Sequence, residues 1–386
     1  MLSLYSQPPE VIKKCLDHPA LRCYVHDQYK LPLYEAFKLF IFPGPIIFFI
    51  RILSMYLLYS LQFVFQTLVF LGYKDWDKPA PRWRRNASQI VMKHFCRACF
   101  FAGGFYWIKY VDHSKDRPKS KNWEDQPRFN WLEDKYPLVG NHCTFIDVLS
   151  VCMCLGAPSF MTKNGVTKDV MARFLSKAFR YILVYRKTDT KPKDYSPQQE
   201  IINRVNEAYD MKHANDTPYA PLVFPEGTTS SGKQVTRFHR GVFVAGKPIR
   251  PFTINYPSQH FSNNYDAVST IRLAYGILTQ FYNKFEMHVY DLYIPNEQER
   301  NNPDLYAENV GKFIAGKLNK PYVDQADLRT SDLVCHILVD NKYRPEEIDD
   351  EIAKLDQIKS QERQIHNDKI AQSKENTEQP NILLQD

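Results

Sequence analysis

The sequence predicts an α/β protein in which a mainly parallel sheet is flanked by helices and preceded by an N-terminal, membrane-embedded helical segment. Three observations support this fold class. After Lys115, short apolar runs alternate with helical stretches; a long apolar stretch lies between Leu39 and Leu71; and a charged tail follows Pro345. Apolar runs buried on both faces and separated by helices are typical of parallel sheets. The 386 residues are enough for one large domain with appendages.

Five short runs, rich in β-branched and aromatic residues, predict the strands of this sheet. They are 136–141 (YPLVGN), 181–186 (YILVYR), 220–227 (APLVFPEG), 249–257 (IRPFTINYP) and 285–295 (FEMHVYDLYIP). Between them, Val166 to Phe179 and Gln198 to Asn215 have the apolar spacing of helices. We therefore expect helices on both faces of the sheet.

The apolar stretch before the sheet predicts a membrane anchor. Ile52 to Leu71 supplies the roughly 20 residues that one bilayer-spanning helix needs, although Gln62 and Gln66 lie within it. The Pro-Gly-Pro sequence at 43–45 and the charge of Arg51 also allow a re-entrant hairpin or a helix lying in the interface. Basic residues are more numerous after the stretch than before it, which places the body of the protein in the cytosol.

The amino-acid composition limits the kinds of ligand or surface that the protein is expected to bind. The formal net charge is +7 and 14% of the residues are aromatic, a combination that suits a protein working on membranes, nucleotides or phosphates. No nucleic-acid-binding motif is present. Among eight scattered cysteines only Cys96 and Cys99 have metal-like spacing, with no second pair, so we expect no metal, no cofactor and reduced thiols.

Two further segments lie outside the predicted strands and the predicted membrane anchor. Phe95 to Tyr110 is too short to span a bilayer and predicts either a core helix or a helix resting on the membrane. The charged tail places four apolar residues on one side of a helix, which we interpret as an exposed helix running into a disordered end. The apolar residues of this helix are Ile348, Ile352, Leu355 and Ile358. The predicted organisation is an N-terminal segment (1–38), a membrane anchor (39–72), a catalytic domain (73–326) and a tail (327–386).

The stretch LVGNHCTFIDVL contains the first candidate catalytic pair. If 136–141 is a strand, His142 lies at its carboxyl end and Asp147 lies in the first turns of the next helix, where open α/β sheets bind ligands. Positions five apart do not share a helix face, so the histidine has to lie in the turn and fold back. The aspartate could then orient the imidazole as a general base. A polar loop with a capping aspartate is the alternative.

A second cluster follows the run at 220–227. Glu226, Gly227 and Thr228 stand at a strand end, and three cations follow closely: Lys233, Arg237 and Arg240. Such a turn can offer backbone N–H groups and positive charge to a phosphate, although a plain loop is the alternative. Arg186 ends the run at 181–186 and is a candidate phosphate clamp if it converges on the same sheet edge.

These motifs, in this order, resemble the four blocks of the glycerolipid acyltransferase family. The blocks are His-x-x-x-x-Asp (His142, Asp147), a strand ending in Arg186, Phe-Pro-Glu-Gly-Thr (224–228) and a later strand containing Pro251. The likeness covers roughly 74–321. The runs at 246–257 and 285–321 look most like the lysophosphatidylcholine and lysophosphatidylethanolamine acyltransferase branch. Departures include His239 where the family usually has lysine, and a tail without a calcium-binding pattern.

The resemblance implies an acyl-CoA-dependent lysophospholipid O-acyltransferase of phospholipid synthesis or remodelling. His142, held by Asp147, would act as the general base, with direct transfer from the thioester to the lysolipid hydroxyl. Arg186, Glu226, Gly227 and Thr228 would bind the acceptor's phosphate, and Pro251 would shape the acyl-CoA side. The expected location is the endoplasmic reticulum membrane with the catalytic domain facing the cytosol. Protein partners are not identifiable, although the tail is a possible site for them.

Three other functions stay open at this point. The acceptor could be lysophosphatidic acid or glycerol 3-phosphate, because the shape of the head-group pocket cannot be read from the sequence. The chain could be a catalytically silent membrane scaffold that binds partners through its tail. Cys143 or Ser150 could serve as the nucleophile of a thioesterase or lipase, but no G-x-S-x-G elbow is present.

Overall fold

The computed structural model describes residues 2–3, 5–26, 30–76, 78, 80–115, 128–132, 134–185, 189–190, 192, 195–210, 219–257 and 261–378. Its strands are β1 (Leu2–Ser3), β2 (Lys30–Leu31), β3 (Ile108–Asp112), β4 (Leu138–Gly140), β5 (Ser159–Lys163), β6 (Ile182–Val184), β7 (Pro221–Val223), β8 (Val235–Thr236), β9 (Arg250–Asn255), β10 (Phe285–Val289) and β11 (Tyr322–Val323). Its α-helices are α1 (Pro9–Asp17), α2 (Leu33–Phe40), α3 (Gly44–Val69), α4 (Arg82–Ala102), α5 (Asp147–Cys154), α6 (Val170–Ala178), α7 (Pro197–Asp210), α8 (Thr270–Leu278), α9 (Glu297–Asn301), α10 (Pro303–Leu318), α11 (Leu328–Leu338) and α12 (Ile348–Glu378).

A seven-stranded sheet forms the centre of the fold, with strand order β3-β10-β9-β4-β7-β5-β6. Strands β9, β4, β7, β5 and β6 are parallel to one another. The edge strand β3 is parallel to β10, and this pair runs antiparallel to β9. The predicted fold class, a mainly parallel sheet flanked by helices, is confirmed. The parallel strands bring their carboxyl ends to one edge of the sheet.

All five predicted strands are present, and two strands of the sheet were not predicted. β5 is short and ends in the polar pair Thr162-Lys163, so its apolar signal is weak. β3 begins at the end of the apolar patch at 95–110, which was interpreted as helical; α4 ends at Ala102, and β3 starts only at Ile108. The first half of the patch is therefore helix, and only its last residues are strand.

Each face of the sheet packs against its own helices. In β4, Leu138 faces a core that also contains residues of α4, α5 and α8, while Val139 faces a second core built with α7 and α10. This alternation within one strand follows from its two-residue side-chain period. The sheet is thus the middle layer of three, as expected for an α/β fold.

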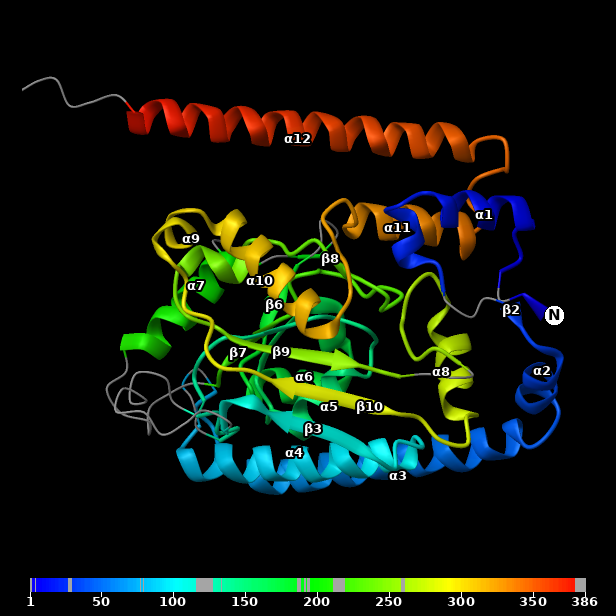
Figure 1. Cartoon of the computed structure of the whole chain (residues 1–386). Helices are drawn as coiled ribbons and strands as arrows, with labels where there is room; N and C mark the ends of the chain where they lie inside the picture. Colours follow the sequence, from blue (N-terminus) through cyan, green and yellow to red (C-terminus); the bar gives the residue numbers. More distant parts are fainter. Residues whose placement is uncertain are drawn as a thin grey trace, which may run out of the picture.

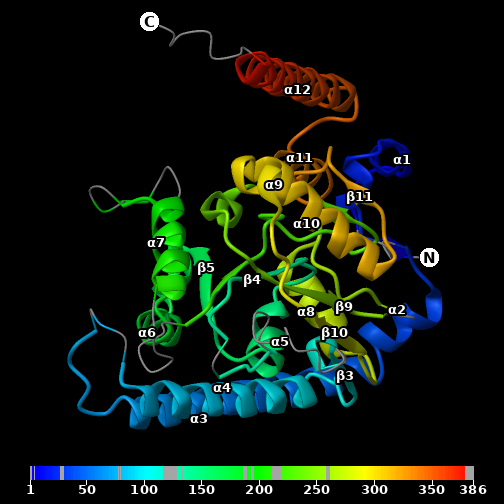
Figure 2. The same ribbon diagram turned by 60° about the vertical axis from the view of Figure 1, so that its left-hand side comes forward.

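Helix α3 lies flat along the domain beside α4, as both views show (Figures 1 and 2). It is the one described helix that is long and apolar enough to cross a membrane. Its polar residues nevertheless face the protein: the side chain of Gln66 hydrogen-bonds to Ser88 in α4, and Arg51 is bonded to the carbonyl oxygens of Leu278 and Phe281. The glutamines that weakened the membrane prediction are therefore accommodated by contacts with α4.

The opposite side of α3 is a continuous apolar surface. Phe49, Leu53 and Tyr56 are each about 70% exposed, at 69%, 69% and 70%. Phe37 of α2, a helix that contacts α3, is also exposed, at 54%. Leaving so much apolar area in water is costly, so this surface indicates contact with a membrane.

The tail helix α12 lies on the far side of the molecule from α3 and α4 (Figures 1 and 2). It was expected to be exposed, but Ile348 and Leu355 are buried. His18 of α1 contacts Asp356, and the ammonium of Lys359 lies 3.1 Å from the carboxylate of Asp327 at the start of α11. The first half of α12 is therefore docked on α1 and α11, and this contact removes its apolar side from water.

Candidate active site

The turn after β4 brings His142 and Asp147 together. His142 follows the carboxyl end of β4, and Asp147 is the first residue of α5. The imidazole Nδ1 lies 2.8 Å from Oδ2 of Asp147. Because a carboxylate only accepts hydrogen bonds, Nδ1 carries a proton, and in the neutral imidazole Nε2 then has a free lone pair. This is the folded-back geometry that the spacing required.

Asp147 is fully buried and held by four donors. Its Oδ2 also accepts the backbone N–H groups of Cys143 and Thr144, at 2.6 and 3.0 Å. Its Oδ1 accepts the hydroxyl of Tyr256 at 2.8 Å. These bonds stabilise the charged carboxylate in the absence of water and fix its direction. The aspartate therefore orients the imidazole and does not only cap α5.

The histidine ring is held on its face as well as at its edge. Phe224, directly after β7, stacks on the imidazole with ring centroids 4.2 Å apart and planes inclined by 8°. The side chain of His142 is 21% exposed, and its Nε2 has no hydrogen-bond partner among the described residues. A fixed, partly accessible imidazole with one unprotonated nitrogen is suited to accept a proton from a substrate.

Glu226 positions the backbone of the same turn. Its Oε1 accepts the N–H of His142 at 2.8 Å, and its Oε2 accepts both the N–H and the hydroxyl of Thr236, at 3.0 and 2.5 Å. Burial raises the pKa of Glu226, while the hydrogen bonds from Thr236 and His142 favour its charged form. The carboxylate is 1% exposed, so in this structure it contacts protein groups. The predicted contact of Glu226 with the acceptor phosphate stays a prediction.

The glycine and threonine of the same loop have different surroundings. Gly227 has a φ of +70°, and a Cβ placed there would lie 3.3 Å from Cδ2 of His239. Only glycine adopts this conformation without strain, and its small size lets His239 approach the loop. The hydroxyl of Thr228 lies 3.3 Å from that of Ser331 in α11. Both residues stand at the sheet edge that carries His142, as the motif predicted.

The other two predicted residues are Pro251 and Arg186. Pro251 lies within β9, opposite Val139, and is buried in the sheet. Arg186 lies outside the described residues. Their predicted roles, on the acyl-CoA side and at the acceptor phosphate, stay predictions.

Two functional residues were missed by the sequence reasoning. Tyr256 directly follows β9, within a run that was read only as a strand, and its hydroxyl is the donor to Asp147. Thr236 lies ten residues after Glu226 and supplies two of its hydrogen bonds. No local spacing signals either contact, because both depend on how separate segments pack.

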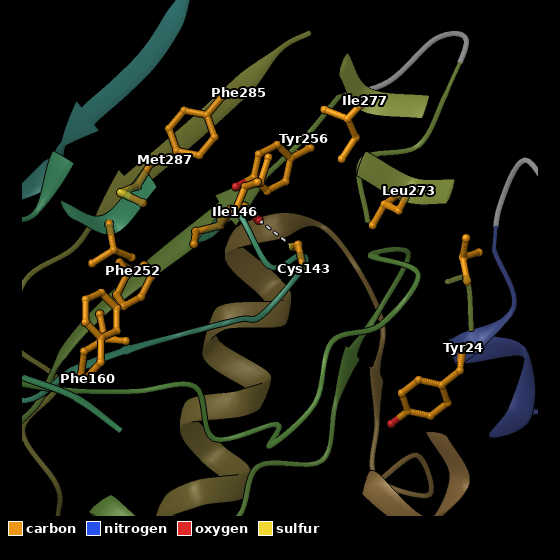
Figure 3. Packing of buried hydrophobic residues seen from close by; sticks show 14 of the residues in the cluster. Tyr24, Cys143, Ile146, Phe160, Phe252, Tyr256, Leu273, Ile277, Phe285 and Met287 are labelled. Atoms are coloured by element: carbon orange, nitrogen blue, oxygen red, sulfur yellow. Dashed lines mark hydrogen bonds between the residues drawn. The ribbon is translucent and has the colours of Figure 1, made fainter. Parts of the chain in front are cut away.

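The two alternative nucleophiles are both inaccessible. Cys143 is 2% exposed, its side chain points into the core toward the carbonyl of Ile254 (Figure 3), and burial raises the pKa of its thiol well above the usual range. Ser150 is fully buried, and its hydroxyl donates to the carbonyl of Asp147 at 2.8 Å. A nucleophile has to reach substrate in its activated form, so this arrangement opposes a thioesterase or lipase mechanism.

Comparisons with known proteins agree with this site. Residues 117–255 match the Acyltransferase family model. The lysophospholipid acyltransferase LPEAT1 of Arabidopsis thaliana is 31% identical over 61% of this chain and 60% of its own length. Lysophosphatidylcholine acyltransferase 2 of Rattus norvegicus is 28% identical over 65% of this chain and 42% of its own length. The chain thus spans less than two thirds of the length of each of these relatives.

A solved structure was also found by its fold. It is the 1-acyl-sn-glycerophosphate acyltransferase PlsC of Thermotoga maritima, which is 15% identical, covers 72% of this chain and 98% of its own, and superposes with a TM-score of 0.45. The matched family region contains His142, Asp147 and the whole Glu226 loop. Residues 117–255 are thus similar to the Acyltransferase family, and the curated relatives that the chain matches are named lysophospholipid and lysophosphatidylcholine acyltransferases.

Proposed function

We propose that this protein is an acyl-CoA-dependent lysophospholipid O-acyltransferase. The observation that carries the proposal is the oriented imidazole of His142, with Nδ1 bound to Asp147 and Nε2 accessible at the carboxyl edge of the sheet. Nε2 removes the proton from the lysophospholipid hydroxyl as that oxygen attacks the thioester carbonyl. The C–S bond then breaks, the new ester is released, and the proton passes from the imidazolium to the thiolate of CoA.

No covalent acyl-enzyme is needed for this reaction. The chain supplies a base, a rigid turn and a membrane surface that holds both substrates near it. General-base catalysis contributes on the order of 10²–10⁴-fold, and the positioning of the two substrates contributes further. The relatives named lysophospholipid and lysophosphatidylcholine acyltransferases support a phosphodiester acceptor for this chain.

We further propose that α3 lies in the plane of the membrane and does not cross it. Its contacts with the domain run from Arg51 to Gln66, which is about 22 Å of helix at roughly 1.5 Å per residue. If α3 crossed the bilayer, the groups bound to it, which are Ser88 and the carbonyl groups after α8, would also have to lie in the hydrocarbon core. An in-plane helix buries only the exposed apolar side, which includes Leu53 and Tyr56.

The topology has its own test. In sealed endoplasmic reticulum vesicles, epitope tags placed at the two ends of the chain are probed with protease from the cytosolic side. With α3 in the plane, both tags are cleaved. A protected N-terminal tag beside a cleaved C-terminal tag refutes the in-plane arrangement, and absence from these vesicles refutes the proposed location.

The catalytic proposal is tested by transfer of labelled acyl groups from acyl-CoA to lysophosphatidylcholine, lysophosphatidylethanolamine, lysophosphatidic acid and glycerol 3-phosphate. We expect transfer to one of the first two acceptors, and loss of transfer in His142→Ala. His336→Ala is a matched control, because His336 also faces an aspartate, Asp340, at 3.9 Å but lies in α11. Preference for either of the last two acceptors would correct the substrate class, and no transfer to any acceptor would favour the scaffold function.

A further inference from the structure

The strand pair at one edge of the sheet leaves one of its faces open. Along β10, Phe285, Met287 and Val289 are buried, while Glu286 and His288 alternate with them and are half-buried. Figure 1 shows β9, β10 and β3 side by side with α10 above them. The open side is a groove with a volume of about 530 Å³. This volume lies within the roughly 300–1,000 Å³ of small-molecule sites.

Flat rings form one wall of this groove. His113 and His288 share a hydrogen bond of 2.9 Å between Nε2 and Nδ1, and their rings are inclined by 15°. Tyr290 lies parallel to His113, with centroids 4.9 Å apart and planes inclined by 1°. Burial and the neighbouring His113 lower the pKa of His288, which favours the neutral form of its ring. Such an array can stack another flat ring, such as a nucleobase.

A lysine side chain lies beside these rings. The ammonium of Lys317, near the end of α10, lies 5.4 Å from the ring centroid of Tyr290 and 5.3 Å from that of Phe313. No carboxylate lies within salt-bridge distance of it among the residues that the structure describes. Asp291 also lines the groove. Flat rings beside an available cation suit a ligand that has both a base and a phosphate.

Strand β9 runs from the groove to the active-site edge of the sheet. Tyr290 lies beside Pro251 near the start of β9, and five residues further along the chain Tyr256, directly after β9, binds Asp147 on the other face of the sheet. This separation is about 17 Å at roughly 3.3 Å per residue. Between the two ends, the ammonium of Lys320 lies 3.0 Å from Oδ1 of Asn255. A second cation therefore stands between the rings and the catalytic edge.

We propose that this groove binds the nucleotide end of the acyl-CoA donor, with adenine on the His113 side and the phosphates near Lys317 and Lys320. The pantetheine arm would then follow β9 to bring the thioester to His142. This inference rests on the proposed function for the identity of the donor. The open face would take no part in the chemistry itself, so its contribution is to the binding of the donor.

The test compares two donors with the full-length protein in lipid nanodiscs. Palmitoyl-CoA contains the nucleotide, and S-palmitoyl pantetheine lacks it. In Lys317→Ala we expect the KM for palmitoyl-CoA to rise about tenfold, which corresponds to one lost charge contact. The kcat and the KM for S-palmitoyl pantetheine should stay unchanged, and Lys317→Arg should restore binding. Lys312→Ala is the matched control, since Lys312 is an exposed lysine of the same helix that pairs with Glu308.

A direct binding measurement separates this proposal from the proposed function. Adenosine 3′,5′-bisphosphate should bind the wild-type protein in calorimetry and bind Lys317→Ala about tenfold more weakly. Equal KM values for palmitoyl-CoA in wild type and Lys317→Ala, or equal calorimetric affinities, overturn the groove assignment even if transfer is robust. No transfer from either donor, together with Lys317-dependent binding of the bisphosphate, refutes the proposed function and leaves a nucleotide site.

Discussion

Replacing Tyr256 with phenylalanine removes one hydroxyl from the buried side of the catalytic pair. The ring of Tyr256 is 4% exposed and packs against Phe105 and Phe285, with centroids 6.0 and 5.3 Å away (Figure 3). Phenylalanine keeps these contacts. The change therefore isolates the 2.8 Å hydrogen bond to Oδ1 of Asp147, an oxygen that has no other partner among the described residues.

The size of the effect follows from leaving a buried carboxylate oxygen without a donor. Hydrogen bonds to charged groups contribute about 1.5–3 kcal/mol. For a domain of this size each kcal/mol shifts Tm by about 2–4 °C, so Tyr256→Phe should lower Tm by about 3–12 °C. Oδ2 keeps its bonds to His142, Cys143 and Thr144, so the pair stays assembled and kcat should fall by about tenfold, a loss near 1.4 kcal/mol.

The pH profile distinguishes a positioning role from a general loss of folding. Without the Tyr256 donor, more negative charge remains on Asp147 and stabilises the protonated imidazole of His142. The acid limb of kcat/KM should therefore move to higher pH in Tyr256→Phe.

Tyr219→Phe is the control for this measurement, because the hydroxyl of Tyr219 is buried without a hydrogen-bond partner among the described residues and its removal should cost little. Thermal unfolding and acyl transfer in detergent give both quantities. Equal Tm values for wild type and Tyr256→Phe, with an unmoved acid limb, would refute the reasoning.

Three other predictions concern the same site. Glu226→Gln should lower both Tm and kcat, since an amide group would face the N–H donors of His142 and Thr236; a fully active variant would show that these bonds are dispensable. Gly227→Ala should cost about 1–2 kcal/mol because of its positive φ, measured as a lower Tm; an unchanged Tm would contradict the assigned backbone conformation. The kcat/KM of the wild type should fall as pH is lowered from about 8 to 5, because a histidine, which typically titrates near pH 6.5, has to be neutral to act as a base. A flat profile would argue against this role of His142.

The parts of the fold that were predicted correctly depend on local patterns. Strongly apolar runs such as 220–227 and 249–257 became β7 and β9, since a strand buried on both faces needs apolar residues at nearly every position. β3 was not predicted, because it comes soon after the aromatic residues at the end of α4 and the two were interpreted together as one helix. The docked half of α12 was predicted to be exposed. The spacing of its apolar residues indicates that one side of the helix is apolar, but it does not indicate which other segment packs against that side.

The sequence by itself predicted the contact between His142 and Asp147, because they are five residues apart and a strand end followed by a helix start leaves them one way to meet; in the structure Nδ1 and Oδ2 lie 2.8 Å apart. Tertiary structure decided the rest of the site. Tyr256 is 109 residues from Asp147, Glu226 is 84 from His142, and the histidines of the groove are 175 apart. Side-chain periodicity assigns a residue to a face, but strand order determines which faces become neighbours, and many distant segments satisfy the same periodicity. For the same reason, the proposal that α3 lies in the plane of the membrane rests on the polar contacts that α3 makes with the domain, and not on its hydrophobicity.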